Sequence, residues 1–362
     1  MSVASSAAVG PPPGMKVRLS SNESPFGPSP AALEAATAVL ADAHLYPDDQ
    51  SLTLRAAIAA DIGRAPDEVA VGTGSAALLM DAIPHACASG PPLDGPAEVL
   101  AFARSFVVYR LAARNAGADY VEVATGGPAT TAAGGYARDV DALLAAITPA
   151  TRVVVIDNPG NPTGVHLSAD ELLTVIEGVP DHVTVIIDEA CHEFATGQHG
   201  YATVGELGVD HPRLLVLRTF SKAYALAGLR VGHVSGPAEL IAALDARRTR
   251  FNVTAVGQAA ALASLGDTDH LERTVAGTLE GRARMAAGLR ELGVAFTDGL
   301  GNFLTIELGT SSGPVVEAYA AHGVGVRPLA PYGMDEQIRV TVGTPAEVDA
   351  FLEASAAVLA PA

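Results

Sequence analysis

The sequence has no tryptophan and only two cysteines among its 362 residues. Cys87 and Cys191 are too few for a disulfide framework, and they fit a reduced, cytoplasmic setting. Apolar runs stay shorter than the roughly 18 residues that a membrane span requires, so we expect none. The first 14 residues lack a basic start and an apolar core. We therefore expect no signal peptide, and we predict a flexible arm over residues 1–14.

Positive charge is also scarce, because 22 basic residues stand against 40 acidic ones and give a formal net charge of −18. A chain this acidic repels phosphate backbones, so general nucleic-acid binding is not expected. Any anionic ligand would need a local basic pocket. The hydrophobic fraction of 49% is ample for a folded core, and the length fits about two domains.

Lysine is the rarest basic residue, with Lys16 and Lys222 as the only two copies. A coding bias toward arginine explains the preference, but arginine cannot be deprotonated in a protein and cannot serve as an amine nucleophile. Lys16 lies near the flexible start, whereas Lys222 follows a predicted buried strand. Lys222 is therefore the candidate nucleophile.

From about residue 68, apolar runs alternate with helical patterns. The predicted buried strands cover 68–71, 97–102, 119–123, 152–157, 183–188 and 213–218. Helical patterns lie between them at about 74–88, 105–116, 138–147 and 168–178, the last with a capping box at 168–171. This alternation predicts an α/β fold with a mostly parallel sheet covered by helices on both faces.

The pattern changes after about residue 245. Two long helical stretches, near 254–265 and 268–292, precede short strands around 303–307, 324–327 and 337–342 and a final helix at about 345–358. An extended start from residue 17 leads into a helical pattern at 31–43. We therefore predict a large domain over 46–244 and a smaller α+β domain built from 15–45 and 245–362.

Polar residues follow four predicted strands, at the edge where open α/β sheets bind ligands. The turn at 72–75 (GTGS) opens a helix whose N-terminus can seat a phosphate. The turn at 158–164 (NPGNPTG) has two Asn-Pro pairs around a glycine, more than a tight turn requires. Asp188 ends one strand, and the segment 218–222 (RTFSK) ends another, with Arg230 eight residues after the lysine. Taken singly, each feature also fits an ordinary turn or helix cap.

Together these motifs resemble the fold-type I pyridoxal-phosphate (PLP) aminotransferases, most closely the histidinol-phosphate aminotransferase subfamily. The resemblance runs from SNESPFGPSP at 21–30 to IRVTVGTPAEVDAFL at 338–352, and NPGNPTG and SKAYALAGLRVG are its most specific segments. It implies the PLP-transferase fold, PLP as cofactor, and glutamate or 2-oxoglutarate as the partner substrate. It also implies a homodimer with shared active sites, and no metal.

The resemblance assigns roles to residues of this chain. Lys222 would bind the cofactor covalently and move a proton, while Asp188 would keep the pyridine nitrogen protonated. Asn161 would hydrogen-bond the ring's 3-oxygen, and Phe106 would stack on the ring. The cofactor phosphate would be held around Gly74, Ser75, Ala76, Thr219, Ser221 and Arg230, with Tyr46 reaching in from the partner subunit.

On the substrate side, Arg339 would grip an α-carboxylate, because its planar fork matches a carboxylate. Arg327 resembles the arginine that contacts the distal phosphate of histidinol phosphate. Asn22 and Asn302 would line the same side.

Two departures from the family concern the ring and the substrate pocket. Cys191 stands where a tyrosine usually donates to the 3-oxygen, and a thiol is a poorer donor. The run at 247–250 (RRTR) replaces the usual basic-proline approach to the next segment. Both changes favour a specialised-pathway aminotransferase that acts on a substrate other than histidinol phosphate.

The alternatives left open are an aromatic or specialised-pathway aminotransferase and a PLP-dependent decarboxylase or lyase on the same scaffold. A non-enzymatic sensor domain is disfavoured by the charge of −18 and by the short arm.

Overall fold

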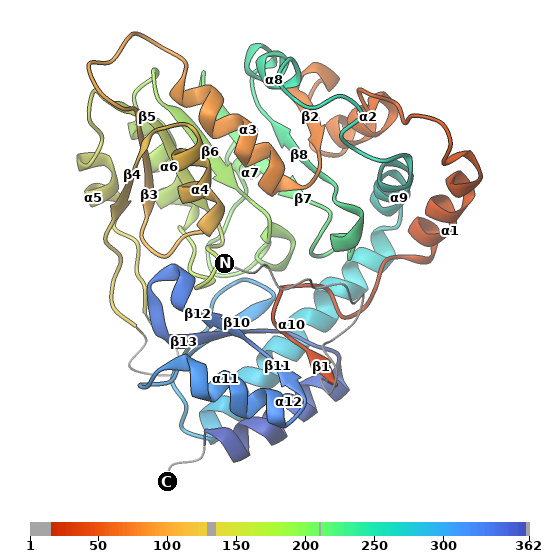
Figure 1. Cartoon of the computed structure of the whole chain (residues 1–362), viewed down its shortest axis with the longest axis vertical. Helices are drawn as coiled ribbons and strands as arrows, with labels where there is room; N and C mark the ends of the chain where they lie inside the picture. The colour runs from red at the N-terminus through yellow and green to blue at the C-terminus, as the bar shows by residue number, and fades with distance from the viewer. Residues whose placement is uncertain (1–15, 129–134, 210, 360–362) are drawn as a thin grey trace, which may run out of the picture.

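The computed structural model describes residues 16–128, 135–209 and 211–359. Its main element is a seven-stranded sheet with the order β2-β8-β7-β6-β5-β3-β4 (Figure 1). The strands are β2 (Val69–Gly72), β3 (Glu98–Phe102), β4 (Asp119–Val123), β5 (Thr151–Asp157), β6 (Thr184–Asp188), β7 (Leu214–Thr219) and β8 (Gly232–Ser235). β8 runs antiparallel to β2 and β7, and the other neighbours are parallel. The predicted mostly parallel sheet is confirmed.

Both faces of this sheet are buried. In β5, Val153 and Val155 belong to the hydrophobic cluster on one face, and Val154 and Ile156 to the cluster on the other. This alternation follows from the period of two in a strand, and burial on both sides explains the unbroken apolar run. Residues of α3 (Ser75–Cys87), α4 (Val107–Asn115) and α8 (Ala238–Asp245) complete the first cluster. Residues of α5 (Val140–Ala145), α6 (Ala169–Gly178) and α7 (Val204–Leu207) complete the second.

A second sheet, four-stranded and antiparallel, lies in the lower part of Figure 1. Its order is β12-β13-β10-β9, with β9 (Phe296–Thr297), β10 (Phe303–Glu307), β12 (Arg327–Leu329) and β13 (Met334–Thr341). Its core includes residues of α10 (Thr268–Glu291), α11 (Ser312–Ala321) and α12 (Pro345–Val358). β1 (Val17–Arg18) pairs with β11 (Val324–Gly325), so the N-terminal segment joins the C-terminal elements. The predicted α+β part is confirmed.

Helix α1 (Pro30–Ala38) is shorter than predicted, because a 3-10 turn over Val39–Asp42 follows it. Ala32 of α1 and Ala260 of α9 (Ala255–Gly266) share a hydrophobic cluster with Val69 of the large sheet and Leu54 of α2 (Leu52–Asp61). These helices therefore pack beside the large sheet. The predicted division into a large domain over 46–244 and a smaller one over 15–45 and 245–362 stays a prediction. Within the described part of the chain, no helix is long and apolar enough to cross a membrane.

Candidate active site

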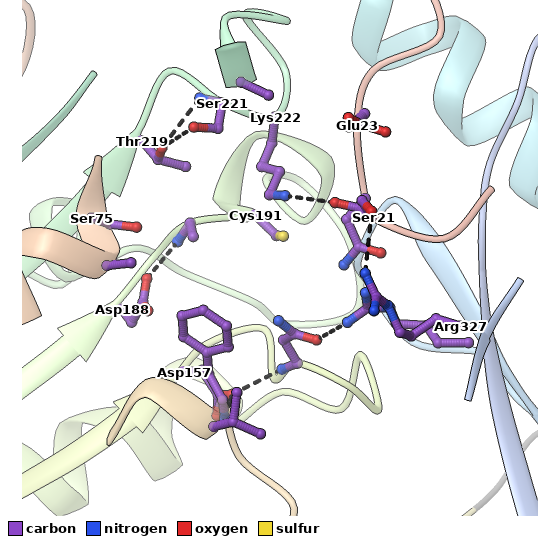
Figure 2. A pocket seen from close by; sticks show the side chains of 18 of the residues that line it. Ser21, Glu23, Ser75, Asp157, Asp188, Cys191, Thr219, Ser221, Lys222 and Arg327 are labelled. Carbon is purple, nitrogen blue, oxygen red and sulfur yellow. Dashed lines mark hydrogen bonds between the residues drawn. The ribbon is translucent and has the colours of Figure 1, made fainter. Parts of the chain in front are cut away.

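The candidate site lies at the carboxyl ends of three neighbouring strands. Asp157, Asp188 and Thr219 are the last residues of β5, β6 and β7, and the chain runs on from Thr219 to Lys222. These strand ends, the N-terminus of α3 and the β12–β13 region enclose a cavity of about 600 Å³. Figure 2 shows Lys222, Cys191, Asp188 and Arg327 around this space. Its position follows the rule for ligand binding in open α/β sheets.

Most of the predicted site residues line this cavity. They are Asn22, Ser75, Ala76, Phe106, Asn161, Asp188, Cys191, Thr219, Ser221, Lys222, Arg230, Arg327 and Arg339. Gly74 precedes Ser75 as the N-cap of α3. Asn302 lies behind the wall, where its Nδ2 donates to the carbonyl oxygen of Asn22 at 3.1 Å. Tyr46 does not line the cavity; it is 82% exposed and stacks on Phe251.

One end of the cavity gathers groups that suit a phosphate. Ser75 is the first residue of α3, whose N-terminus carries partial positive charge. The Thr219 hydroxyl is 3.0 Å from Ser221 Oγ, and Arg230 Nη1 donates to Ser221 Oγ at 3.3 Å. A Cβ at Gly74 would lie 2.4 Å from Arg230 Nη2, so glycine leaves room for the guanidinium. Within the described residues, Arg230 forms no ion pair, and its charge is free for an anion.

Asp188 is 3% exposed and has two hydrogen-bond donors. Tyr109 Oη donates to its Oδ2 at 3.0 Å, and the Ala190 N–H donates to its Oδ1 at 3.2 Å. Burial, followed by the negative charge of Asp157, raises the pKa of Asp188 to about 7. A protonated pyridine nitrogen is the kind of cation that would stabilise this carboxylate. No local sequence pattern identifies Tyr109 as a site residue, although it lies three residues after Phe106.

Lys222 is partly buried, and its Nζ donates to the carbonyl oxygen of Ser21 at 3.3 Å. Burial lowers the pKa of Lys222, which favours the neutral amine that nucleophilic attack needs. Cys191 faces the same space, where burial raises its pKa to about 12. Its thiol therefore stays neutral.

The opposite wall carries two arginines from neighbouring strands. Arg327 of β12 and Arg339 of β13 are directly opposite each other in the register. Arg327 Nε donates to the Ser20 carbonyl oxygen at 2.9 Å, and Arg339 donates to Asn161 Oδ1. Arg339 is 5% exposed, and its buried Nε has no hydrogen-bond partner in the described residues. Such a donor is suited to an anionic ligand.

These residues fit PLP. The arginine, hydroxyls and helix N-terminus suit the phosphate of PLP, and Asp188 suits its ring nitrogen. Lys222 reaches into the same space beside Cys191 (Figure 2). The described residues contain no cluster of three or more metal-ligating side chains. Cavity residues that the sequence analysis did not single out include Ser21, Glu23, Asp157 and Tyr332.

Comparisons with known proteins agree with this geometry. The sequence model of the family described as aminotransferase class I and II matches residues 14–354. A histidinol-phosphate aminotransferase of Methylococcus capsulatus is 40% identical over 95% of this chain and 91% of its own length. An aromatic amino acid aminotransferase of Rhodococcus opacus is also 40% identical, over 93% of this chain and 88% of its own.

Among solved structures, the histidinol-phosphate aminotransferase of Sinorhizobium meliloti in complex with PLP superposes with a TM-score of 0.84. It is 27% identical in sequence, with 95% of this chain and 91% of that one covered. The fold, the cavity and these relatives together lead to one conclusion: this chain belongs to the aminotransferase class I and II family and is a PLP-dependent aminotransferase.

Proposed function

We propose that this aminotransferase moves the amino group of a phosphorylated donor, of the histidinol-phosphate kind, to 2-oxoglutarate. The observation that carries the proposal is the cross-strand pair of Arg327 and Arg339 in the cavity wall. Neither arginine forms an ion pair within the described residues. Like charges directly opposite each other repel, and a dianion between them relieves that repulsion.

Histidinol phosphate has no α-carboxylate, so both arginines are free to bind its phosphate. With 2-oxoglutarate, the same two groups can bind its two carboxylates. The relative from Methylococcus capsulatus, named a histidinol-phosphate aminotransferase, supports this assignment. The pair therefore explains how one site accepts both substrates.

The chain's own residues would divide the work as follows. When bound, PLP supplies an electron sink for the charge left on the donor after its α-proton departs. Lys222 would take that proton at Nζ and return it, since its amine has a lowered pKa. Asp188 would hold a proton on the ring nitrogen, and Arg230 would anchor the phosphate. Asn161 and Phe106 would fix the ring's orientation.

A donor panel with 2-oxoglutarate tests this proposal. We expect kcat/KM for histidinol phosphate to exceed that for phenylalanine and tyrosine. Arg327→Ala should lower kcat/KM for histidinol phosphate by about 10-fold or more, because the substrate phosphate loses one charged hydrogen-bond donor, and should spare neutral donors. Equal losses for phosphorylated and neutral donors would make Arg327 structural. Carbon dioxide release without glutamate formation would instead identify a decarboxylase.

A second candidate is an aromatic amino acid aminotransferase. Arg327 already donates to the Ser20 carbonyl oxygen and is 3.3 Å from Ser21 Oγ, contacts that could be its whole role. The Rhodococcus opacus relative carries that activity in its name at the same 40% identity. Preference for phenylalanine or tyrosine in the donor panel would support this candidate.

We also propose that the protein works as a homodimer whose partner contributes Tyr46. Exposed apolar side chains in the segment 33–52, together with Phe251, support this. They are Leu33, Leu40, Leu45, Tyr46, Leu52 and Phe251, all at least 38% exposed. Burying such side chains against a second copy would remove them from water. The cytoplasmic location stays a prediction.

A further inference from the structure

Asp157 joins the two loops that carry Phe106 and Asn161. Its Oδ2 accepts the Asn161 N–H at 2.9 Å and the Phe106 N–H at 3.1 Å, and its Oδ1 accepts the Ser105 hydroxyl at 3.2 Å. Asp157 is 3% exposed and lines the cavity, and Figure 2 shows it below the open space. One carboxylate therefore fixes the backbone on two sides of the cofactor pocket.

A buried arginine forms an ion pair with this carboxylate. Arg138 Nη2 is 2.6 Å from Asp157 Oδ1, and its Nη1 donates to the Asp157 carbonyl oxygen at 2.5 Å. The side chains of this pair are only 2% and 4% exposed. A Cβ at Gly160 would lie 2.3 Å from Arg138 Nη2, so the glycine inside NPGNPTG provides the space for the guanidinium. Gly160 leaves the space in which Arg138 reaches Asp157, so the contact depends on all three residues.

Asp157 is also the strand neighbour of Asp188, because the two are paired in the register of β5 and β6. Asp157 has its arginine, whereas Asp188 forms no ion pair within the described residues. The groups whose interactions shift the pKa of Asp188 are Asp157, the Tyr109 hydroxyl, the Ala190 N–H and Glu189. After burial itself, the negative charge of Asp157 is the largest influence that raises this pKa.

We propose that Asp157, held by its ion pair with Arg138, is a positioning residue of the active site. It fixes the backbone from which Phe106 and Asn161 reach the cofactor ring, and its charge strengthens the attraction of Asp188 for a cationic ring nitrogen. The inference rests on the ring-contact roles proposed above for Asp188, Asn161 and Phe106.

Binding of PLP to the cofactor-free protein tests the proposal through the variant Asp157→Asn. The variant loses the charge and one acceptor oxygen, so we expect PLP affinity at pH 8 to fall by about 10-fold or more. Affinity should also depend on pH, because a protonated Asp188 no longer attracts the ring nitrogen. In the variant, the midpoint of that loss should move to lower pH by about 0.5 unit or more. A merely structural residue would not move this midpoint.

Asp245→Asn is the matched control, since Asp245 pairs with the buried Arg55 outside the residues that line the cavity. It should lower stability while leaving the PLP affinity and its pH midpoint unchanged. Asp157→Asn with Arg138→Gln removes both charges and should recover stability without recovering PLP affinity. If Asp157→Asn does not fold, PLP affinity and its pH midpoint are measured on this double variant instead.

Two results would overturn the proposal. One is a pH midpoint in Asp157→Asn equal to that of the wild type. The other is recovery of PLP affinity together with stability in the double variant, which would mean that Asp157 acts only through folding. The donor panel is a separate measurement, so a wrong substrate assignment would leave these binding results unaffected.

Discussion

The buried acids around the cavity hold their protons at unusually high pH. Burial raises the pKa of Asp188 to about 7 and that of Glu193 to about 8. For an acid whose pKa is higher in the folded state, folding is favoured below the ordinary pKa. That advantage is lost as the pH rises through the folded-state value. The contribution of these two acids to the stability of the cofactor-free protein should therefore fall as the pH rises from about 4 to about 8.

The variant Asp188→Asn isolates this effect, because an amide does not titrate. We expect the free energy of unfolding of the wild type to fall relative to the variant from about pH 4 to pH 7, and then to level off. A difference of about 3 pKa units sets an upper bound of roughly 4 kcal/mol. Urea unfolding of both cofactor-free proteins at several pH values measures it. Glu193 titrates in both, so its contribution cancels. A difference that does not vary with pH would contradict the raised pKa.

Cys191 offers a second test at the level of one residue. Its neutral thiol faces the cavity where relatives are expected to carry a tyrosine. A hydroxyl that donates to the charged 3-oxygen of the ring favours the deprotonated form of the bound cofactor. Cys191→Tyr should therefore lower the pH at which the cofactor's absorption changes, measured by spectral titration. Cys87→Ser is the control, since Cys87 does not line the cavity. An unchanged or higher midpoint would show that another group already fills this role.

Among the elements, β8 shows most clearly what the sequence could not predict. Its four residues, Gly232–Ser235, are too few for a clear hydrophobic period, yet the strand lies between β2 and β7. The longer apolar runs of the large sheet agree with the predicted strands to within a residue, as β4 and β5 show. In the smaller sheet, β13 begins three residues before the predicted strand at 337–342. A strand can be predicted from sequence when it is long and buried on both faces. β8 has only four residues, so it is too short to predict in this way.

The position of Gly232 gives β8 a role beside the phosphate end of the cavity. A Cβ there would lie 2.6 Å from the Ser75 backbone nitrogen and 2.8 Å from the Gly74 carbonyl carbon, both main-chain atoms that cannot yield easily. Gly232→Ala should displace the N-terminus of α3 and cost roughly 1–3 kcal/mol of stability. It should also weaken PLP binding, measured by titration of the cofactor-free protein. Gly205→Ala is the control, because its nearest neighbour would be 3.9 Å away. Unchanged PLP affinity in Gly232→Ala would show that α3 tolerates the shift.

The sequence predicts those parts of the candidate site in which the order of the strands is enough to bring the residues together. Asp188 and Lys222 follow adjacent parallel strands, so the strand-end rule places them at one edge. Arg339 lies on a different sheet, and only the family resemblance pointed to it. Tyr109 and Arg138 were missed because they act through contacts with Asp188 and Asp157 that no local pattern records.

At the scale of the whole molecule, the cavity of one chain holds all the predicted cofactor contacts except Gly74, at its edge, and Tyr46. Tyr46 is instead 82% exposed and stacks on Phe251 with ring centroids 4.5 Å apart. A large aromatic pair left in water is typical of a surface that binds a partner. In a two-fold dimer, each copy would give its Tyr46 to the other copy's cavity.

Hybrid dimers test this exchange. Tyr46→Ala should be impaired because neither cavity receives the tyrosine, and Lys222→Ala should be inactive. Co-expression of the two variants forms mixed dimers in which the cavity with Lys222 receives Tyr46 from the other subunit. If equal chains pair at random, half of the dimers are mixed and each has one intact site, so activity should reach about a quarter of the wild type. Differently tagged copies and size-exclusion chromatography establish that the mixed species forms. No gain of activity in the isolated mixed dimer would mean that Tyr46 serves its own subunit or no active site at all.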